Sequence, residues 1–169
     1  MSFIESVKGA LPDYAKDTKL NLDAVLLRST LDADVAMGCA VAALAATGNG
    51  KILSVILADA PVHAESAMTA ASIMAQNNVW YPYVEMADDP ALKGLPAQLR
   101  MNAIISHGGT TKSNFEAFSL AASIVGKCHF CVKAHYDTLK NSEGYTVEQL
   151  RDIGRIASVM NSVAKVLNS

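Results

Sequence analysis

Residues 116–135 read Glu116-Ala-Phe-Ser-Leu-Ala-Ala-Ser-Ile-Val-Gly-Lys-Cys128-His-Phe-Cys131-Val-Lys-Ala-His135. The residues before the glycine are mostly good helix formers, and Gly126 suits a helix end because glycine adopts the left-handed C-cap conformation without strain. A second helix is expected to begin at Cys128. The stretch therefore predicts two antiparallel helices, with two thiols at the start of the second.

The whole chain has the composition of a helical protein. It is 51% hydrophobic but only 6% aromatic, so its apolar mass is mainly Ala, Leu, Val, Ile and Met. These residues favour packed helices over a β-sandwich. We therefore expect an all-α fold that forms one compact unit over residues 1–169. The apolar fraction is high for a domain of this size, which also favours burial between subunits.

Prolines and glycines divide the chain into helix-length segments. Thr146 followed by Gln149 predicts a capping box at the start of the last helix. Few windows alternate as a strand would, and Pro82 interrupts the clearest of them. Helices are expected near residues 2–9, 32–46, 50–59, 62–76, 88–94, 97–106, 112–125, 128–141 and 146–167.

A short internal similarity relates two parts of the chain. Glu65-Ser-Ala-Met-Thr-Ala-Ala-Ser-Ile73 aligns with Glu116-Ala-Phe-Ser-Leu-Ala-Ala-Ser-Ile124 at a constant offset of 51 residues. The same offset pairs Asn77 with Cys128 and Trp80 with Cys131. Two copies of one helical hairpin, of which only the second kept its thiols, explain the pattern; the alternative is coincidence between alanine-rich helices.

The spacing within residues 116–135 brings two thiols, an imidazole and a carboxylate together. Cys128 is expected in the first turn of its helix, where unpaired N–H groups and the positive dipole end stabilise a thiolate. Cys128, Cys131 and His135 fall within an arc of about 60°. Cys131 and His135 are one turn apart, so they are placed to interact directly or through water. Glu116, on the preceding helix, is placed to hold the imidazole tautomer.

Two chemistries fit this cluster. In the first, a thiolate attacks a peroxide O–O bond to give a sulfenic acid, and the second cysteine condenses with it to form a disulfide. An external dithiol must then reopen that disulfide. In the second, Cys128, Cys131 and His135 are ligands of a metal ion in a helical metal-binding or stress-response interaction module, with the fourth ligand from Glu116 or another chain.

Charge and cysteine usage exclude several other classes. Lys plus Arg number 14 and Asp plus Glu number 16, without a basic stripe, so neither nucleic acid nor a membrane is an expected partner. The N-terminal residues do not form a signal peptide, and the most apolar stretch, residues 35–47, is too short to span a bilayer. We expect a cytoplasmic protein whose CxxC is redox-active, while Cys39 is a buried, inert thiol.

The pattern Glu116-x11-Cys128-x2-Cys131-x3-His135 resembles the AhpD-type alkylhydroperoxidases of the carboxymuconolactone decarboxylase-like superfamily. The resemblance covers nearly the whole chain, since similar stretches also occur at residues 10–22, 73–79, 99–105, 114–116 and 134–139.

This resemblance implies an all-helical fold of two related halves, about 1–95 and 96–169, assembled as a homotrimer. It implies an antioxidant enzyme that reduces organic hydroperoxides and also a partner peroxiredoxin. No cofactor is expected to be bound. The implied reductant is an external dithiol, the lipoyl group of a lipoylated acyltransferase-type protein.

The resemblance also assigns roles by position. Cys131 becomes the peroxidatic cysteine that passes through sulfenic acid, and Cys128 becomes the proton donor that then forms the Cys128–Cys131 disulfide. His135 and Glu116 become the proton relay. The choice of Cys131 rests on the resemblance, because helix position alone favours Cys128.

The pair between the cysteines departs from part of the family. Some members carry Ser-His there, whereas this chain carries His129-Phe130, which moves the histidine by about 100° around the helix. His129 is therefore only a secondary relay candidate, expected to be half-exposed, and Phe130 is expected to pack inward. A decarboxylase-type lactone reaction is a further option, but it needs no dithiol, so the intact CxxC argues against it.

Two other groups of residues are expected to be structural. Trp80, Tyr81 and Tyr83 form an aromatic cluster that is expected to pack in the core or at an interface. The flexible thioether side chains of the methionines suit irregular gaps between helices. They are expected to fill the core: Met37, Met68, Met74 and Met160.

Overall fold

The computed structural model describes residues 2–168, and within them the fold is all-α, as the composition predicted. Short 3₁₀ turns precede α2 and follow α7 at residues 13–15 and 107–109. No helix within the described residues is both long and apolar enough to cross a membrane. The α-helices are α1 (Phe3–Ala10), α2 (Lys16–Leu26), α3 (Ala33–Thr47), α4 (Gly50–Leu57), α5 (Ala64–Ala87), α6 (Pro90–Lys93), α7 (Ala103–Ser106), α8 (Lys112–Gly126), α9 (His129–Asn141) and α10 (Val147–Val166).

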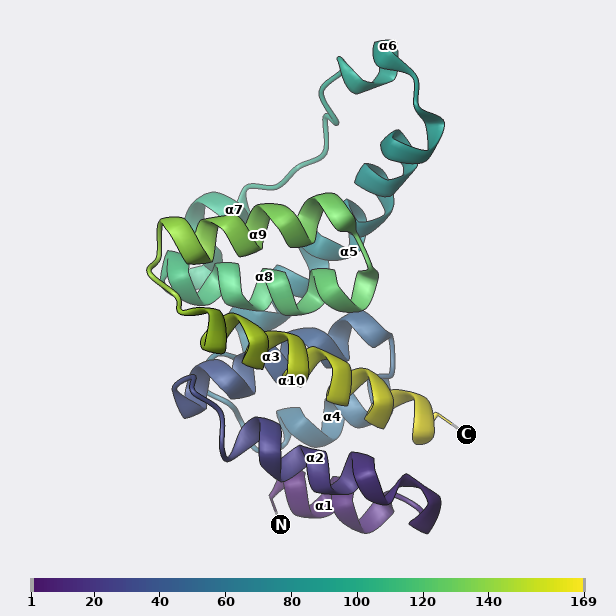
Figure 1. The fold of residues 1–169 in the computed structure, drawn as a ribbon, viewed down its shortest axis with the longest axis vertical. Coiled ribbons are helices and arrows are strands. Elements are labelled where there is room, and N and C mark those ends of the chain that lie inside the picture. The colour runs from purple at the N-terminus through teal and green to yellow at the C-terminus, as the bar shows by residue number, and fades with distance from the viewer. Residues whose placement is uncertain (1, 169) are drawn as a thin grey trace.

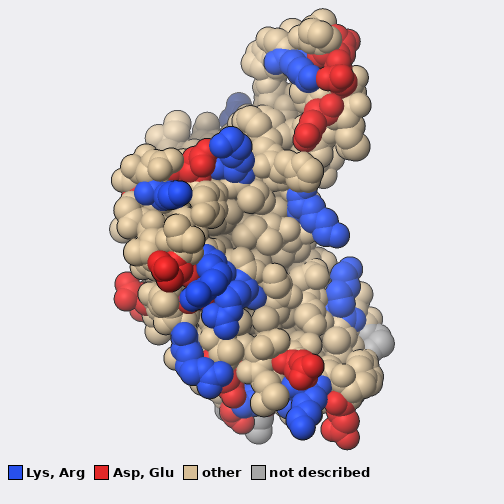
Figure 2. All heavy atoms as spheres, in the orientation of Figure 1, with Lys and Arg blue, Asp and Glu red and all other residues tan. Residues whose placement is uncertain are grey.

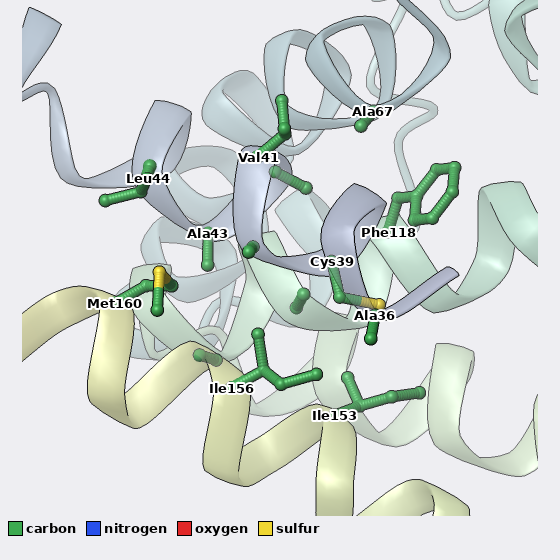
Figure 3. Packing of buried hydrophobic residues seen from close by; sticks show 14 of the residues in the cluster. Ala36, Cys39, Val41, Ala43, Leu44, Ala67, Phe118, Ile153, Ile156 and Met160 are labelled. Atoms are coloured by element: carbon green, nitrogen blue, oxygen red, sulfur yellow. The ribbon is translucent and has the colours of Figure 1, made fainter. Parts of the chain in front are cut away.

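Helix α3 is the centre of the core. It is apolar on every side, and most of its residues between Val35 and Leu44 are buried, which is the pattern of a helix surrounded by others. It packs against α5, α8 and α10. Its small residues allow close approach: a Cβ at Gly38 would lie 2.3 Å from the ring of Phe118 on α8. Figure 3 shows Cys39 of this helix among apolar side chains.

Helices α8 and α9 form an antiparallel pair on one side of α3, and α10 crosses the other side of α8 (Figure 1). The start of α10 is fixed by the predicted capping box. Thr146 Oγ1 accepts a hydrogen bond from the N–H of Gln149, whose side chain accepts one from the N–H of Thr146. Asn49 caps α4 and donates to the carbonyl of Ala164, which ties α4 to the end of α10.

An arm projects from this body. The second half of α5 leads out to α6, and an extended segment returns to α7 (Figure 1). Figure 2 shows the arm standing clear of the body, with acidic side chains along one edge of it. Several of its apolar side chains are exposed, among them Val79, Met86 and Leu95. We define the arm as residues 79–100.

The arm corrects two predicted helices. The helix expected to end near residue 76 continues through Pro82 to Ala87. Tyr81 stacks on Phe130 with ring centroids 4.3 Å apart, and packing of this kind outweighs the helical hydrogen bond that proline cannot donate. The helix expected over residues 97–106 forms only at Ala103–Ser106. Gln98 has a left-handed φ of 53°, which is incompatible with a continuous helix.

Helix α2 was not predicted from the sequence. Its residues are mostly polar, and only Leu22, Val25 and Leu26 are buried. Helix α2 packs against α10, α1 and α3, and this packing makes a weakly amphipathic segment helical.

Candidate active site

The dithiol lies where α8 ends and α9 begins. Lys127, with a φ of 55°, is the left-handed C-cap of α8, and Cys128 is the N-cap of α9. The expectation that Gly126 is the C-cap is wrong. Gly126 remains helical against α5, where a Cβ would lie 2.0 Å from Nδ2 of Asn78. The glycine is therefore required by close helix packing, and the following residue takes the turn.

Cys128 caps α9 with its sulfur atom. Its Sγ accepts a hydrogen bond from the N–H of Cys131 at 3.2 Å. A helix N-terminus of this kind stabilises negative charge on the capping atom. The backbone carbonyl of Asn77 on α5 lies 3.9 Å from the same sulfur and is placed to accept the thiol hydrogen in the reduced form.

Cys128 and Cys131 are joined by a disulfide, with their Cα atoms 5.3 Å apart. Both residues are buried, at 0% and 3% exposure. Cys39 is free, and burial in the α3 core raises the pKa of its thiol. Cys39 lies in the middle of α3, whereas the sulfur of Cys128 caps the N-terminus of α9, where a thiolate is stabilised, so the CxxC is the reactive pair within residues 2–168.

His135 and Glu116 form the contact that the sequence predicted. Nδ1 of His135 on α9 lies 2.7 Å from Oε2 of Glu116 on α8, and both side chains are largely buried. The other ring nitrogen, Nε2, lies 3.2 Å from Sδ of Met74 on α5. Because both nitrogens have partners, the direct hydrogen bond between His135 and Cys131 that the spacing allows is not made in this disulfide form.

His129 and Phe130 lie outside this buried cluster. The His129 side chain is 85% exposed, and its Nδ1 is 4.0 Å from Oε1 of Glu85. His129 is thus more exposed than expected. The inward packing expected of Phe130 is wrong. The residue is 56% exposed and stacks on Tyr81 of the arm instead of entering the core.

A cavity of about 630 Å³ adjoins the start of α9. It lies between the arm and the outer face of α9, and aromatic rings form much of its wall. Trp80 and Tyr81, expected to pack in the core or at an interface, line this cavity with Phe130, while Tyr83 is half-exposed. Its charged lining residues are Glu85, Lys93 and Lys133.

Two residues at the site were not predicted. Met74 was assigned to core filling, and Asn77 was noted only as the counterpart of Cys128. Both are buried on α5, one turn apart, and both contact the cluster. The internal similarity could have indicated Asn77, because a residue that aligns with Cys128 is expected near the contact between the two copies.

The other methionines that were expected in the core differ in burial. Met160 is fully buried, Met37 is partly buried and Met68 is exposed.

The metal-binding hypothesis expected Cys128, Cys131 and His135 to be ligands, and the structure of residues 2–168 does not support such a site. No group of three His, Cys, Asp or Glu side chains there is arranged to hold a metal ion. The two sulfur atoms are bonded to each other, and His135 is engaged by Glu116 and Met74.

Comparisons with known proteins agree with the all-α fold and identify the family of the chain. Residues 90–169, which include the dithiol, match the carboxymuconolactone decarboxylase family. Three relatives carry the name alkyl hydroperoxide reductase AhpD. The protein of Rhodospirillum centenum is 42% identical, covering 98% of this chain and 91% of the relative. That of Anaeromyxobacter dehalogenans is 39% identical, covering 99% and 91%. That of Coxiella burnetii is 39% identical, covering 96% of each. The chain belongs to the AhpD family.

Proposed function

We propose that this protein is a dithiol-dependent peroxidase that reduces organic hydroperoxides. The observation that carries the proposal is the buried Cys128–Cys131 pair at the N-terminus of α9, beside the Glu116–His135 contact. The overall reaction is balanced: one hydroperoxide and two thiols give one alcohol, one water and one disulfide. The names of the AhpD relatives support the same substrate class.

Cys131 is the proposed peroxidatic residue. Its thiolate attacks the peroxide O–O bond, the alkoxide leaves with a proton, and the sulfur becomes a sulfenic acid. Cys128 then attacks that sulfur and expels water. His135 and Glu116 take the proton when the thiolate forms and return it to the leaving oxygen. The capping bond to Cys128 supports a second role, because a stabilised thiolate leaves readily when a reductant attacks the disulfide at Cys131.

Turnover requires an outside source of electrons. We propose a lipoyl dithiol carried by an acyltransferase-type protein as the reductant, and a peroxiredoxin as a second acceptor of electrons. No bound cofactor takes part in the proposed cycle. A cycling dithiol suits the cytoplasm, where thiols are kept reduced. We also propose a homotrimer, in which exposed apolar side chains of the arm, such as Val79 and Met86, are covered.

The test is one equivalent of an organic hydroperoxide added to the reduced protein. The expected result is loss of two titratable thiols and a Cys128–Cys131 disulfide in the peptide mass spectrum. Cys128→Ser is expected to trap a sulfenic acid on Cys131, detectable with dimedone, and Cys131→Ser to show no peroxide-dependent change. Sulfenic acid on Cys128 would reverse the assignment, and unchanged thiols in the wild type would remove the proposal.

A further inference from the structure

We propose that Met74 is a positioning residue for the His135 ring. The inference rests on the proposed function, because His135 is the group that the proposed proton relay uses. Its basis is the 3.2 Å contact between Sδ of Met74 and Nε2 of His135. A thioether sulfur accepts a hydrogen bond, although a weaker one than oxygen accepts. The ring therefore lies between two acceptors, the Glu116 carboxylate and the Met74 sulfur.

The geometry makes this a fixed contact. Met74 is 1% exposed on α5, whereas Glu116 is on α8 and His135 on α9, so one residue from each of three helices meets at the ring. Helix α5 packs against both α8 and α9. A buried side chain held by such packing has few rotamers available, and the sulfur stays opposite Nε2.

The chemical consequence concerns the interval between two proton transfers. When the relay has taken a proton from a thiol, a hydrogen is present on both ring nitrogens. Nδ1–H then donates to Glu116 and Nε2–H donates to Met74, so neither buried donor is left without a partner. Because both N–H groups have acceptors, the protonated ring is held in one orientation until the relay gives the proton up again.

The experiment compares Met74→Leu with Met160→Leu. Both changes replace a buried methionine by an apolar side chain of similar volume, but Met160 belongs to the hydrophobic core between α10 and its neighbours, away from His135. Leucine removes the acceptor opposite Nε2. We expect Met74→Leu to lower kcat for hydroperoxide about tenfold with an unchanged KM, and Met160→Leu to leave both unchanged. Met74→Gln, which restores an acceptor of similar length, is expected to recover most of the lost kcat.

Nitrogen-15 spectra of the histidine rings give a readout that does not depend on turnover. In the wild type, the Nε2 signal of His135 is expected to report the contact with the Met74 sulfur, and Met74→Leu is expected to shift it while Met160→Leu does not. Unchanged His135 signals and kcat in Met74→Leu would overturn the inference. Lack of peroxidase activity in the wild type would instead remove the proposed function, and the ring spectra would then still decide whether Met74 holds His135.

Discussion

Helix α5 and the α8–α9 pair contain the two similar stretches of sequence, and their backbones follow different paths. Residues 64–87 form one continuous helix, whereas the residues that align with them stop at Gly126 and restart at His129. The aligned positions meet in space at two points. His63 contacts Asn114, and the carbonyl of Asn77 faces Sγ of Cys128, both pairs being 51 residues apart.

These contacts show that α5 and α8 run in the same direction and in register. The break after Gly126 then has a specific effect, because it creates a helix N-terminus that the buried side chain of Cys128 caps. Helix α5 has no N-terminus at Asn77. One stretch therefore offers the positive end of a helix to a sulfur atom, and the other offers a backbone carbonyl. The division of the whole chain into two halves stays a prediction.

The largest expected difference between the two stretches is the effect of replacing their aligned glutamates, Glu116 and Glu65, on the rate of peroxide-driven disulfide formation. Glu116→Gln removes the carboxylate from Nδ1 of His135, and we expect the rate of peroxide-driven disulfide formation to fall about a hundredfold, since a positioned acid–base pair contributes on that scale. The matched control is Glu65→Gln at the aligned, exposed position, where no change in rate is expected. Stopped-flow fluorescence measures both. Equal effects of the two changes would contradict the assignment of the relay to one stretch.

The next expected difference is the effect on stability of adding a methyl group at Gly126, where α8 ends. Gly126→Ala forces Asn78 to move, which also disturbs its hydrogen bond to the carbonyl of Ala122. We expect a loss of about 1–3 kcal/mol in the free energy of unfolding, measured by urea denaturation. Alanine in a helix ordinarily stabilises it, so the sign distinguishes close packing from helix propensity.

Two controls support this measurement. The aligned residue Ala75 is exposed, and Ala75→Gly is expected to cost about 1 kcal/mol from propensity alone. Asn78→Ala added to Gly126→Ala should recover stability, because it removes the side chain that the new methyl group meets. A double variant no more stable than Gly126→Ala would show that another contact opposes the methyl group.

The last expected effect lies in neither stretch but on α10. Burial raises the pKa of the Asp152 carboxyl, but hydrogen bonds from Thr30 and Arg155 outweigh burial and lower the pKa to about 2. A carboxyl whose folded pKa is below the unfolded value stabilises the fold above the unfolded pKa. This stabilisation is lost as the pH falls from about 5 towards 2.

We expect this carboxyl to contribute about 2 kcal/mol at pH 7. Urea denaturation between pH 7 and pH 2.5 measures it, and Asp152→Asn should flatten that part of the profile. A variant with the same acid-dependent loss as the wild type would assign the loss to other carboxyls, including those of the two stretches compared above.

The sequence predicted the elements that depend on local signals. The start of α10 follows from its capping box, and the Glu116–His135 contact follows from helical spacing. The parts that failed depend on neighbours distant in sequence. Phe130 stacks on Tyr81 of the arm and stays outside the core, and α5 continues through Pro82 next to this contact.

The site shows the same limit. Gly126 read as a helix end because glycine tolerates left-handed backbone, but its neighbour Asn78 requires the absence of a side chain. Met74 read as core because its thioether is apolar, and only the arrangement of α5 and α9 brings its sulfur to a ring nitrogen. Neither fact is contained in the local pattern of the chain.

The burial of the Cys128–Cys131 disulfide limits how fast an external reductant can reduce it. A reductant must reach a sulfur atom along the S–S axis, yet the two cysteines are 0% and 3% exposed. The first turn of α9 has to open before a mixed disulfide can form, and such local openings have their own rate. At high reductant concentration the rate of reduction should therefore level off at the opening rate, a property of the protein and not of the electron donor.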